Sequence, residues 1–158
     1  MVVTAAVATG CGPSTTANQF DAKVTRVVDG DTIVVQFADG KTDKVRILGV
    51  DTPETHKPGT PVQCFGPDAE KFTRERLSGR SVRLELDKES RDKYKRLLAY
   101  VYVEGQRFED ELLRRGFAKV LIIAPNGRHA KPMIAAEAAA KSMRAGLWGA
   151  CAANASKR

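Results

Sequence analysis

Residues 24–50 read VTRVVDGDTIVVQFADGKTDKVRILGV, and the rest of the architecture is built outward from this stretch. The stretch contains three short apolar segments, at 24–28, 33–37 and 45–50. The dipeptides Asp29-Gly30 and Asp39-Gly40 separate them. Apolar residues that alternate with polar ones are typical of β-strands, and Asp-Gly is a strong signal for a hairpin turn. The stretch therefore predicts an antiparallel meander of three strands.

Downstream of the meander, the chain switches between helical and extended patterns. Pro67 and Gly79 stand where helices favour them, at the first helical position and just after the last. The expected elements are helices at 67–78, near 107–115 and at 131–145, strands at 82–87 and 97–103, a charged turn at 88–96, and an extended segment at 117–123. Five strands with a helix between the third and fourth is the order of an OB-fold barrel. We therefore predict an α+β, mainly β domain over residues 20–150, a five-stranded OB-fold barrel with about three packed helices.

Composition and charge limit the class of partner. The chain has 158 residues, enough for one domain, with 42% hydrophobic and 28% charged residues. No run of eighteen apolar residues occurs, so no transmembrane helix is predicted. The net charge of +7 favours polyanionic partners such as nucleic acid, although solubility alone explains it about equally well. Residues 1–70 carry six basic and nine acidic side chains, whereas residues 114–158 carry nine basic and one acidic. A fold that joins the two halves would set carboxylates opposite a basic surface.

The N-terminal segment has the pattern of an export signal. Residues 1–19 contain no charged side chain, and a short apolar run leads through small residues to Cys11. This pattern resembles the end of a bacterial signal peptide with a lipoprotein cleavage site, which would make Cys11 the lipidated residue. Free secretion and a plain disordered N-terminus are the alternatives. We expect residues 1–19 and the tail 151–158 to lie outside the domain, in a protein that is secreted or held on the cell envelope.

Three clusters of charged residues carry the candidate chemistry, at 29–32, at 46 with 51–54, and at 92–96. Separately, each is explained as a hairpin turn, a solvated loop or an exposed charged turn. Together they supply what phosphodiester hydrolysis needs. Asp31 and Asp51 offer oxygen ligands to a hard cation such as Ca²⁺, and Glu54 is a spare acid that can take a proton from water. Arg46 and Arg96 can hold phosphoryl oxygens with their fork-shaped guanidinium groups.

Five segments resemble the staphylococcal nuclease family in order and spacing. They are VVDGDT (27–32), VRILGVDTPET (45–55), FGPDAEKFT (65–73), DKYKRLLAYVYVEG (92–105) and LLRRGFAKV (112–120). The resemblance covers about residues 20–149. It implies an OB-fold barrel with packed helices and a Ca²⁺-dependent enzyme that cuts DNA and RNA and leaves 3′-phosphate ends. Because the ion is inferred from the family and from oxygen ligands, Mn²⁺ and Mg²⁺ stay open.

The resemblance also implies a role for each matching residue. Asp31 and Asp51 would bind the metal with their carboxylates, and Thr52 would bind it with its backbone carbonyl. Glu54 would position or deprotonate the attacking water. Arg46 would contact the phosphate in both the ground state and the transition state.

The third cluster carries the remaining roles and the first departure from the family pattern. Arg96 would stabilise the developing charge and the leaving oxygen, and Lys93 and Tyr94 would contact the terminal phosphate of the nucleotide. Lys95 stands where the family often has glycine. Residues 121–123, Leu-Ile-Ile, follow the segment after which the best-known member has tyrosines that flank the base. Substrate binding is therefore expected to depend on charge more than on base stacking.

The cysteines leave two interpretations open. With Cys11 set aside, Cys64 and Cys151 form either a disulfide in an oxidising compartment or two unrelated buried thiols. Their positions, near the Phe-Gly segment and after Leu147–Gly149, resemble those in secreted bacterial relatives, which favours the disulfide.

Two other classes of function are alternatives to a nuclease. A non-catalytic nucleic-acid-binding OB-fold module would be favoured by loss of Arg46, Glu54 or Arg96, and all three are present. An oligosaccharide-binding OB domain would need an aromatic stripe, and aromatic residues make up only 6% of the chain. We expect a monomer that acts on DNA and RNA and needs no protein partner.

Overall fold

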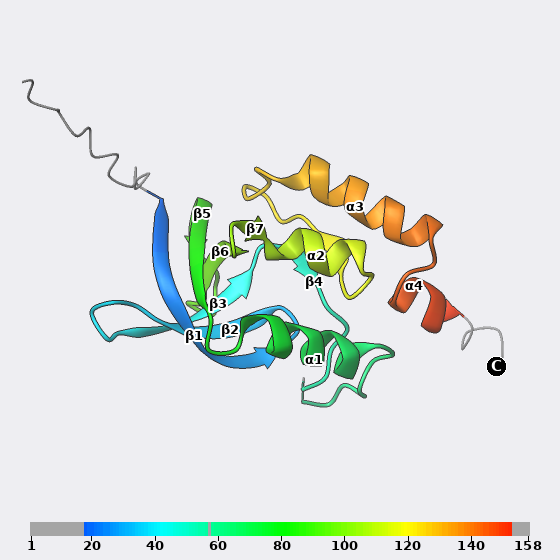
Figure 1. Ribbon diagram of the computed structural model, residues 1–158, viewed down its shortest axis with the longest axis horizontal. Coiled ribbons are helices and arrows are strands. Elements are labelled where there is room, and N and C mark those ends of the chain that lie inside the picture. Colours follow the sequence, from blue (N-terminus) through cyan, green and yellow to red (C-terminus); the bar gives the residue numbers. More distant parts are fainter. Residues whose placement is uncertain (1–17, 57, 153–158) are drawn as a thin grey trace, which may run out of the picture.

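The computed structural model describes residues 18–56 and 58–152, and the predicted meander is present in it (Figure 1). Strands β1 (Gln19–Asp29), β2 (Thr32–Gln36) and β3 (Thr42–Ile47) pair antiparallel in chain order. Their apolar side chains alternate inward, as the period-two pattern requires. Most of the predicted export segment, including Cys11, lies outside the described residues.

Two further strands close the meander into a barrel. Strand β5 (Ser81–Arg91) pairs antiparallel with β1 and with β6 (Leu97–Val103). Strand β6 then pairs in parallel with β3, which joins the two edges of the sheet. The short strand β7 (Gln106–Arg107) extends the sheet beside β6. The prediction of a mainly β fold with a five-stranded barrel is confirmed.

Helices cover the barrel and complete its core. Helix α1 (Gly66–Leu77) packs on β1, while α2 (Phe108–Arg114) packs on β6 and on α3 (Ala130–Ser142). These are the three predicted helices. Fully buried aliphatic side chains from the barrel and the helices form one cluster that includes Val24, Ile33, Leu84, Leu112 and Met133. Stacked rings of Phe65, Phe117, Phe72 and Phe108 extend the cluster between α1 and α2.

The third predicted strand is wrong in one respect, because the chain breaks it at Leu48. The segment continues as β4 (Gly49–Asp51), which pairs antiparallel with β8 (Lys119–Leu121) in a separate sheet. Gly49 permits the break because its φ is +78°, and a Cβ there would lie 2.4 Å from the sulfur of Met133. An apolar pattern alone carries no signal for this change of sheet.

Two other boundaries differ from the prediction. Strand β5 runs to Arg91, so the first residues of the predicted turn 88–96 are extended. Their exposed polar side chains look like a turn in sequence, yet Arg91 still pairs with Leu97 across the ladder. The short helix α4 (Leu147–Ala150) was not predicted.

A disulfide ties the two ends of the helical layer together. Cys64, before α1, and Cys151, after α4, have sulfur atoms 2.11 Å apart, so the interpretation as two unrelated thiols is wrong. The bond joins positions 87 residues apart in sequence. Within the described ranges, no helix has the length and apolar character that crossing a membrane requires.

Candidate active site

The tight turn between β1 and β2 positions the first acidic residues. The backbone N–H of Asp31 donates to the carboxylate of Asp29, 3.1 Å away. Gly30 between them is packed so closely that a Cβ would lie 2.6 Å from the hydroxyl oxygen of Thr52. Thr73 of α1 donates a 2.7 Å hydrogen bond to the Gly30 carbonyl. The turn therefore contacts Thr52, after β4, on one side and is hydrogen-bonded to helix α1 through Thr73.

Arg46 draws two carboxylates to one place. Its Nη2 lies 3.1 Å from Oδ2 of Asp31 and 3.2 Å from Oδ1 of Asp51. Its Nη1 donates to the carbonyls of Ile47 and Val50, at 2.7 and 2.8 Å. These contacts leave the Arg46 side chain 15% exposed and fix its orientation. The break after β3 brings the carbonyls and Asp51 within reach of this guanidinium.

Thr52 belongs to the same group through its backbone. Its N–H donates to Oδ2 of Asp31 at 3.0 Å, and its side chain is buried. The other oxygen of Asp31 accepts from the hydroxyl of Thr32 at 3.1 Å. Asp31, Asp51 and Thr52, the three predicted metal ligands, are therefore neighbours in the structure.

Negative charge is crowded beside this group. Burial, together with the charges of Asp31 and Glu54, raises the pKa of Asp29 to about 6. The charge of Glu54 therefore acts on Asp29. Asp29 was not among the predicted site residues. A signal was available, since two Asp residues flank one glycine at the end of a buried strand.

The chemistry of these groups fits a hard divalent cation that has few protein ligands. Carboxylate and carbonyl oxygens are the ligands that Ca²⁺ and Mg²⁺ prefer. Within the described ranges, no three His, Cys, Asp or Glu side chains gather as a potential metal site. Two carboxylates with one carbonyl would leave the other coordination positions to water and substrate oxygens.

Hydrogen bonds within the loop between β4 and α1 hold the backbone of Glu54. The side-chain oxygen of Gln63 accepts from the backbone N–H of Glu54 at 3.0 Å. The backbone N–H of Gln63 donates to the Glu54 carbonyl at 2.9 Å. Cys64, the next residue, is bonded to Cys151. Gln63 therefore fixes the backbone of the predicted base, a role that the sequence analysis missed because nothing in the local pattern marks a contact across this loop.

The turn between β5 and β6 presents the third cluster. The Asp92 carboxylate accepts from the backbone N–H groups of Tyr94 and Arg96, both at 2.9 Å. It also accepts from Nε of Arg96 at 2.7 Å. Lys95 has a φ of 64°, which lies in the left-handed region that favours glycine. Asp92 thus orients the backbone of the turn and the guanidinium of Arg96 together.

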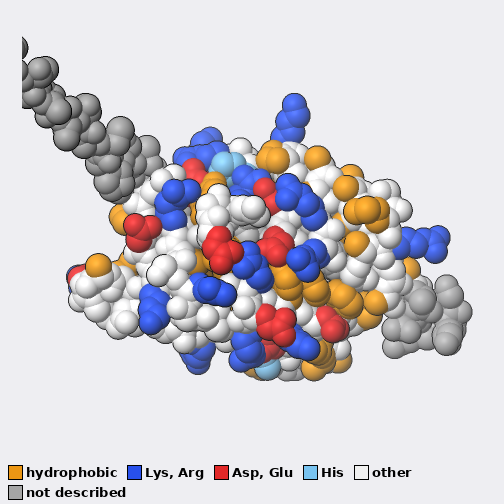
Figure 2. Space-filling view, viewed as in Figure 1, with side chains coloured by type: hydrophobic (Ala, Val, Ile, Leu, Met, Phe, Trp, Pro, Cys, Tyr) orange, Lys and Arg blue, Asp and Glu red, His pale blue; other side chains and the backbone are white. Residues whose placement is uncertain are grey.

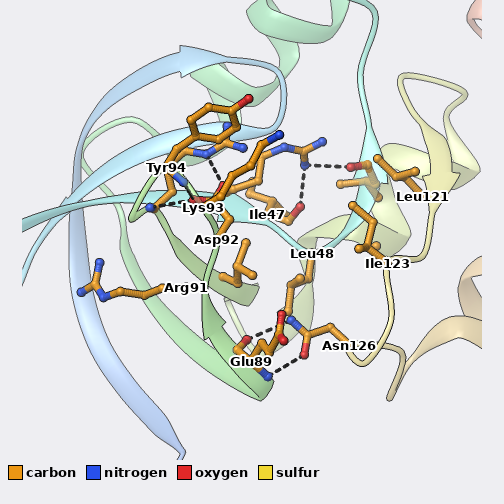
Figure 3. Close-up of a pocket in the computed structure, with 15 residues that line it drawn as sticks. Ile47, Leu48, Glu89, Arg91, Asp92, Lys93, Tyr94, Leu121, Ile123 and Asn126 are labelled. Carbon is orange, nitrogen blue, oxygen red and sulfur yellow. Dashed lines mark hydrogen bonds and ion pairs between the residues drawn. The ribbon is translucent and has the colours of Figure 1, made fainter.

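Residues from the β5–β6 turn and from β3, β4 and β8 line a cavity of about 450 Å³ (Figure 3). Arg46 and Arg96 both line it, as do Lys93 and Tyr94. Figure 3 shows Tyr94 and Lys93 on one side and Leu121 and Ile123 on the other. The amide of Asn126 bridges the backbone of Glu89 at its lower end, at 2.8 and 2.9 Å.

The first cavity does not contain the whole candidate site. Asp51 and Thr52 line a neighbouring hollow of about 200 Å³ that also contacts the disulfide. Arg46 connects the two parts, because it lines the first cavity and contacts Asp51. Figure 2 shows that basic side chains spread over one face of the molecule with acidic ones between them. The separation of acids and bases along the sequence is therefore not a separation on this face.

Comparison with known proteins assigns this arrangement to a family. Residues 44–150 match the family described as staphylococcal nuclease homologue. The chain belongs to the staphylococcal nuclease family. It is 42% identical over 132 residues to the thermonuclease of Staphylococcus hyicus, which covers 84% of this chain and 78% of that protein. It is 46% identical over 125 residues to endonuclease YncB of Bacillus subtilis, covering 78% of this chain and 59% of that protein.

Two features of this site concern the residues at which the sequence was expected to depart from the family pattern. Lys95 occupies a backbone conformation that suits glycine. The wall opposite Tyr94 is aliphatic, because Leu121 and Ile123 line it. Leu121 and Ile123 line the cavity that holds Arg96, whereas Lys95 is next to Arg96 in the chain and does not line that cavity. The predicted role of each site residue remains a prediction, although the structure brings the predicted residues together.

Proposed function

We propose that this protein is a Ca²⁺-dependent nuclease that cuts DNA and RNA and leaves 3′-phosphate ends. Membership of the staphylococcal nuclease family makes it a hydrolase of phosphodiester bonds. The observation that carries the proposal is the contact of Arg46 with Asp31 and Asp51, beside a cavity that Arg96 also lines. The ion, the range of substrates and the product ends are the parts that need testing.

The two arginines would bind the phosphate. Hydrolysis places extra negative charge on a phosphorus surrounded by five oxygens, and a guanidinium can donate two parallel hydrogen bonds to such oxygens. Arg46 is held by two backbone carbonyls, and Arg96 is held by Asp92. Because both are oriented before substrate binds, they need little rearrangement as the charge develops.

Glu54 would take the proton of the attacking water. A carboxylate can act as a general base where its charge is not already cancelled by a fixed cation. The electrostatic effect of Glu54 on Asp29 supports this role. Gln63 holds the Glu54 backbone from both its N–H and its carbonyl. The backbone that carries this carboxylate is therefore held in place.

Asp31, Asp51 and the Thr52 carbonyl would hold the ion. When bound, Ca²⁺ would neutralise a phosphoryl oxygen and orient water near it. Without the ion, the acidic group repels a phosphate. Arg46 offsets part of that repulsion because it contacts two of the acids.

A cleavage assay with metal control tests the proposal. Single-stranded DNA and RNA are incubated with the protein in Ca²⁺, in Mg²⁺, in Mn²⁺ and in excess chelator. We expect cleavage of both polymers in Ca²⁺, none in chelator, and fragments whose 3′ ends accept primer extension only after phosphatase treatment. Binding without cleavage in every metal would overturn the proposal and support a non-catalytic binding module. Cleavage that persists in chelator would overturn the role of the ion.

We also propose that the protein is exported and held on the cell envelope through Cys11. The uncharged segment that leads to Cys11 supports this, and so does the Cys64–Cys151 disulfide, because such bonds persist in oxidising compartments. Expression in a bacterium, followed by fractionation and mass measurement, tests it. A lipid adduct that disappears in Cys11→Ser is expected. An unprocessed chain in the cytoplasm would contradict export.

A further inference from the structure

A second groove lies next to the candidate site, beside the β5–β6 turn. It has a volume of about 460 Å³ and is lined by Lys44, Tyr94, Lys95 and Arg96. Three of these side chains are cationic, one is aromatic, and none is acidic. Lys44 lies on β3, two residues before Arg46, so the strand that supplies the site also supplies the groove.

The acidic residues beside the two lysines already have cationic partners. Asp43, which precedes Lys44, has its carboxylate 2.5 Å from Arg91. The carboxylate of Asp92 is held by Arg96 at 2.7 Å. The positive charge of Lys44 and Lys95 is therefore not cancelled by these neighbours and remains available to an anion.

The groove is continuous with the cavity of the candidate site. Tyr94 and Arg96 line both. The Tyr94 ring is 68% exposed and lies near two cations, 5.1 Å from the ammonium of Lys93 and 5.4 Å from the guanidinium carbon of Arg96. A polymer bound beside Arg96 can thus pass along one side of this ring into the groove.

The conformation of Lys95 adds a separate argument. A non-glycine residue with positive φ is strained, and such strain is often found at binding sites. The turn is well held nonetheless, because Arg91 donates to the Lys95 carbonyl at 2.6 Å and Asp92 fixes both ends. Glycine would fit this backbone more easily but would supply no charge. The presence of lysine in a strained position is explained if its ammonium group binds a ligand.

We propose that Lys44 and Lys95 form a second phosphate-binding position, which holds the backbone of a nucleic acid beyond the nucleotide that is cut. The ligand is a single-stranded polynucleotide, bound through its phosphates without regard to base sequence. This inference rests on the proposed function, because it assigns the groove to the same substrate. It predicts that the lysines improve binding of long substrates and leave short ones unaffected.

Binding measured in chelator, where nothing is expected to be cut, tests the groove separately from catalysis. The probes are a labelled long single-stranded oligonucleotide and a dinucleotide, each titrated over a series of salt concentrations. The variants are Lys44→Ala and Lys95→Gly, and the latter suits the left-handed backbone, so it should fold. Lys41→Ala is the matched control. Lys41→Ala also removes one positive charge, from the β2–β3 hairpin that carries Lys44. The Lys41 side chain is 82% exposed and is paired with Asp39.

We expect each groove variant to bind the long oligonucleotide about three- to tenfold more weakly, with a log–log salt slope smaller by about 0.7. Dinucleotide binding should not change, and Lys41→Ala should resemble the parent. Equal losses for both probes, or losses no greater than those of Lys41→Ala, would overturn the proposal. If the parent cleaves nothing in any metal, the proposed function is wrong. The length-dependent binding result does not depend on cleavage and would still test the groove.

Discussion

The molecule contains two clusters of acidic side chains that are built in opposite ways. The catalytic cluster, named for its proposed function, comprises Asp29 and Asp31 at the β1–β2 turn, Arg46 on β3, Asp51 at the end of β4, and Glu54 in the loop that follows. The sheet cluster stands on β5 and β6 and on the segment before α3, and comprises Glu85, Asp87, Tyr100, Tyr102, Arg128 and His129. Both contain buried carboxylates, but they differ in how the negative charge is compensated.

In the sheet cluster, the protein itself supplies the donors. The Asp87 carboxylate accepts from the hydroxyl of Tyr100 at 3.0 Å and from the backbone N–H groups of Gly127 and Arg128 at 2.9 and 3.0 Å. Glu85 accepts from Tyr102 at 2.6 Å and from Arg128 at 2.5 Å. Burial alone would raise the pKa of each acid, but these hydrogen bonds outweigh it and lower both.

In the catalytic cluster, compensation is incomplete. One guanidinium is shared by two acids, and burial together with neighbouring acids raises the pKa of Asp29 to about 6. A cluster that satisfies its own charges contributes to folding. A cluster that retains net negative charge is prepared to bind a cation. Variants in the two clusters should therefore affect different measurements.

The largest effect is expected from Glu54→Gln in the catalytic cluster. Loss of a general base typically lowers kcat by roughly 10²- to 10⁴-fold. The fold should survive, because the hydrogen bonds that hold Glu54 involve its backbone. Initial rates at saturating DNA and a thermal melt measure the two properties. Glu75→Gln, an exposed position on α1, is the matched control and should keep full activity. Near-normal turnover in Glu54→Gln would show that the role assigned to this residue is wrong.

The second prediction concerns how the catalytic loop is held. Cys64 is adjacent to Gln63, so the disulfide anchors the loop that positions Glu54 to helix α4. Replacing both cysteines by serine should lower the free energy of unfolding by about 2–5 kcal/mol, because the bond closes a long loop in the unfolded chain. We also expect kcat to fall more than KM rises. Denaturant unfolding and steady-state kinetics measure both. If stability falls while kcat is unchanged at a temperature where the variant is folded, the bond does not position the base.

The third prediction concerns the sheet cluster. Asp87→Ala leaves one buried donor and two partly buried donors without their acceptor, which should cost about 3 kcal/mol of stability. Turnover well below the melting temperature should not change, because Asp87 touches none of the catalytic cluster. Urea unfolding and the cleavage assay check this, with the exposed Asp21→Ala on β1 as control. Loss of turnover without loss of stability would break the distinction between the two clusters.

The sequence predicted the main elements and the candidate site, but it did not predict the sheet cluster. The strand order, the three main helices and the residues of the candidate site follow from alternation, turn signals and resemblance. The sheet cluster was not predicted, because Glu85 and Asp87 occupy the outward positions of an alternating strand. They are buried only because the chain at Gly127–His129 folds back over that face. The break at Leu48 likewise depends on contacts with β8 and Met133, which are distant in sequence, and Gln63 acts through a contact across its own loop that no local pattern marks.

A third kind of buried acid, Glu109 of α2, separates burial from catalysis. It is fully buried, and one oxygen accepts from the backbone N–H of Val101 at 3.0 Å. The other oxygen has no hydrogen-bond partner within the described residues. Burial raises its pKa from 4.5 to about 8, although the charge of Arg107 opposes the rise. A raised pKa is thus not by itself a mark of the catalytic cluster.

The effect expected from Glu109→Gln is a change in how stability depends on pH. Between about pH 5 and pH 8 the folded state keeps a proton that the unfolded state loses, so rising pH destabilises the parent by at most about 1.4 kcal/mol per unit. The variant has no such proton and should show a flatter profile, with its stability relative to the parent increasing up to about pH 8. Denaturant unfolding at several pH values measures this, and Glu111→Gln on the same helix is the control. Parallel profiles for parent and variant would mean that Glu109 is charged in the folded protein. Glu109 would then differ from both clusters. It would be a buried charge that is neither balanced within the fold, as in the sheet cluster, nor available to a ligand, as in the catalytic cluster.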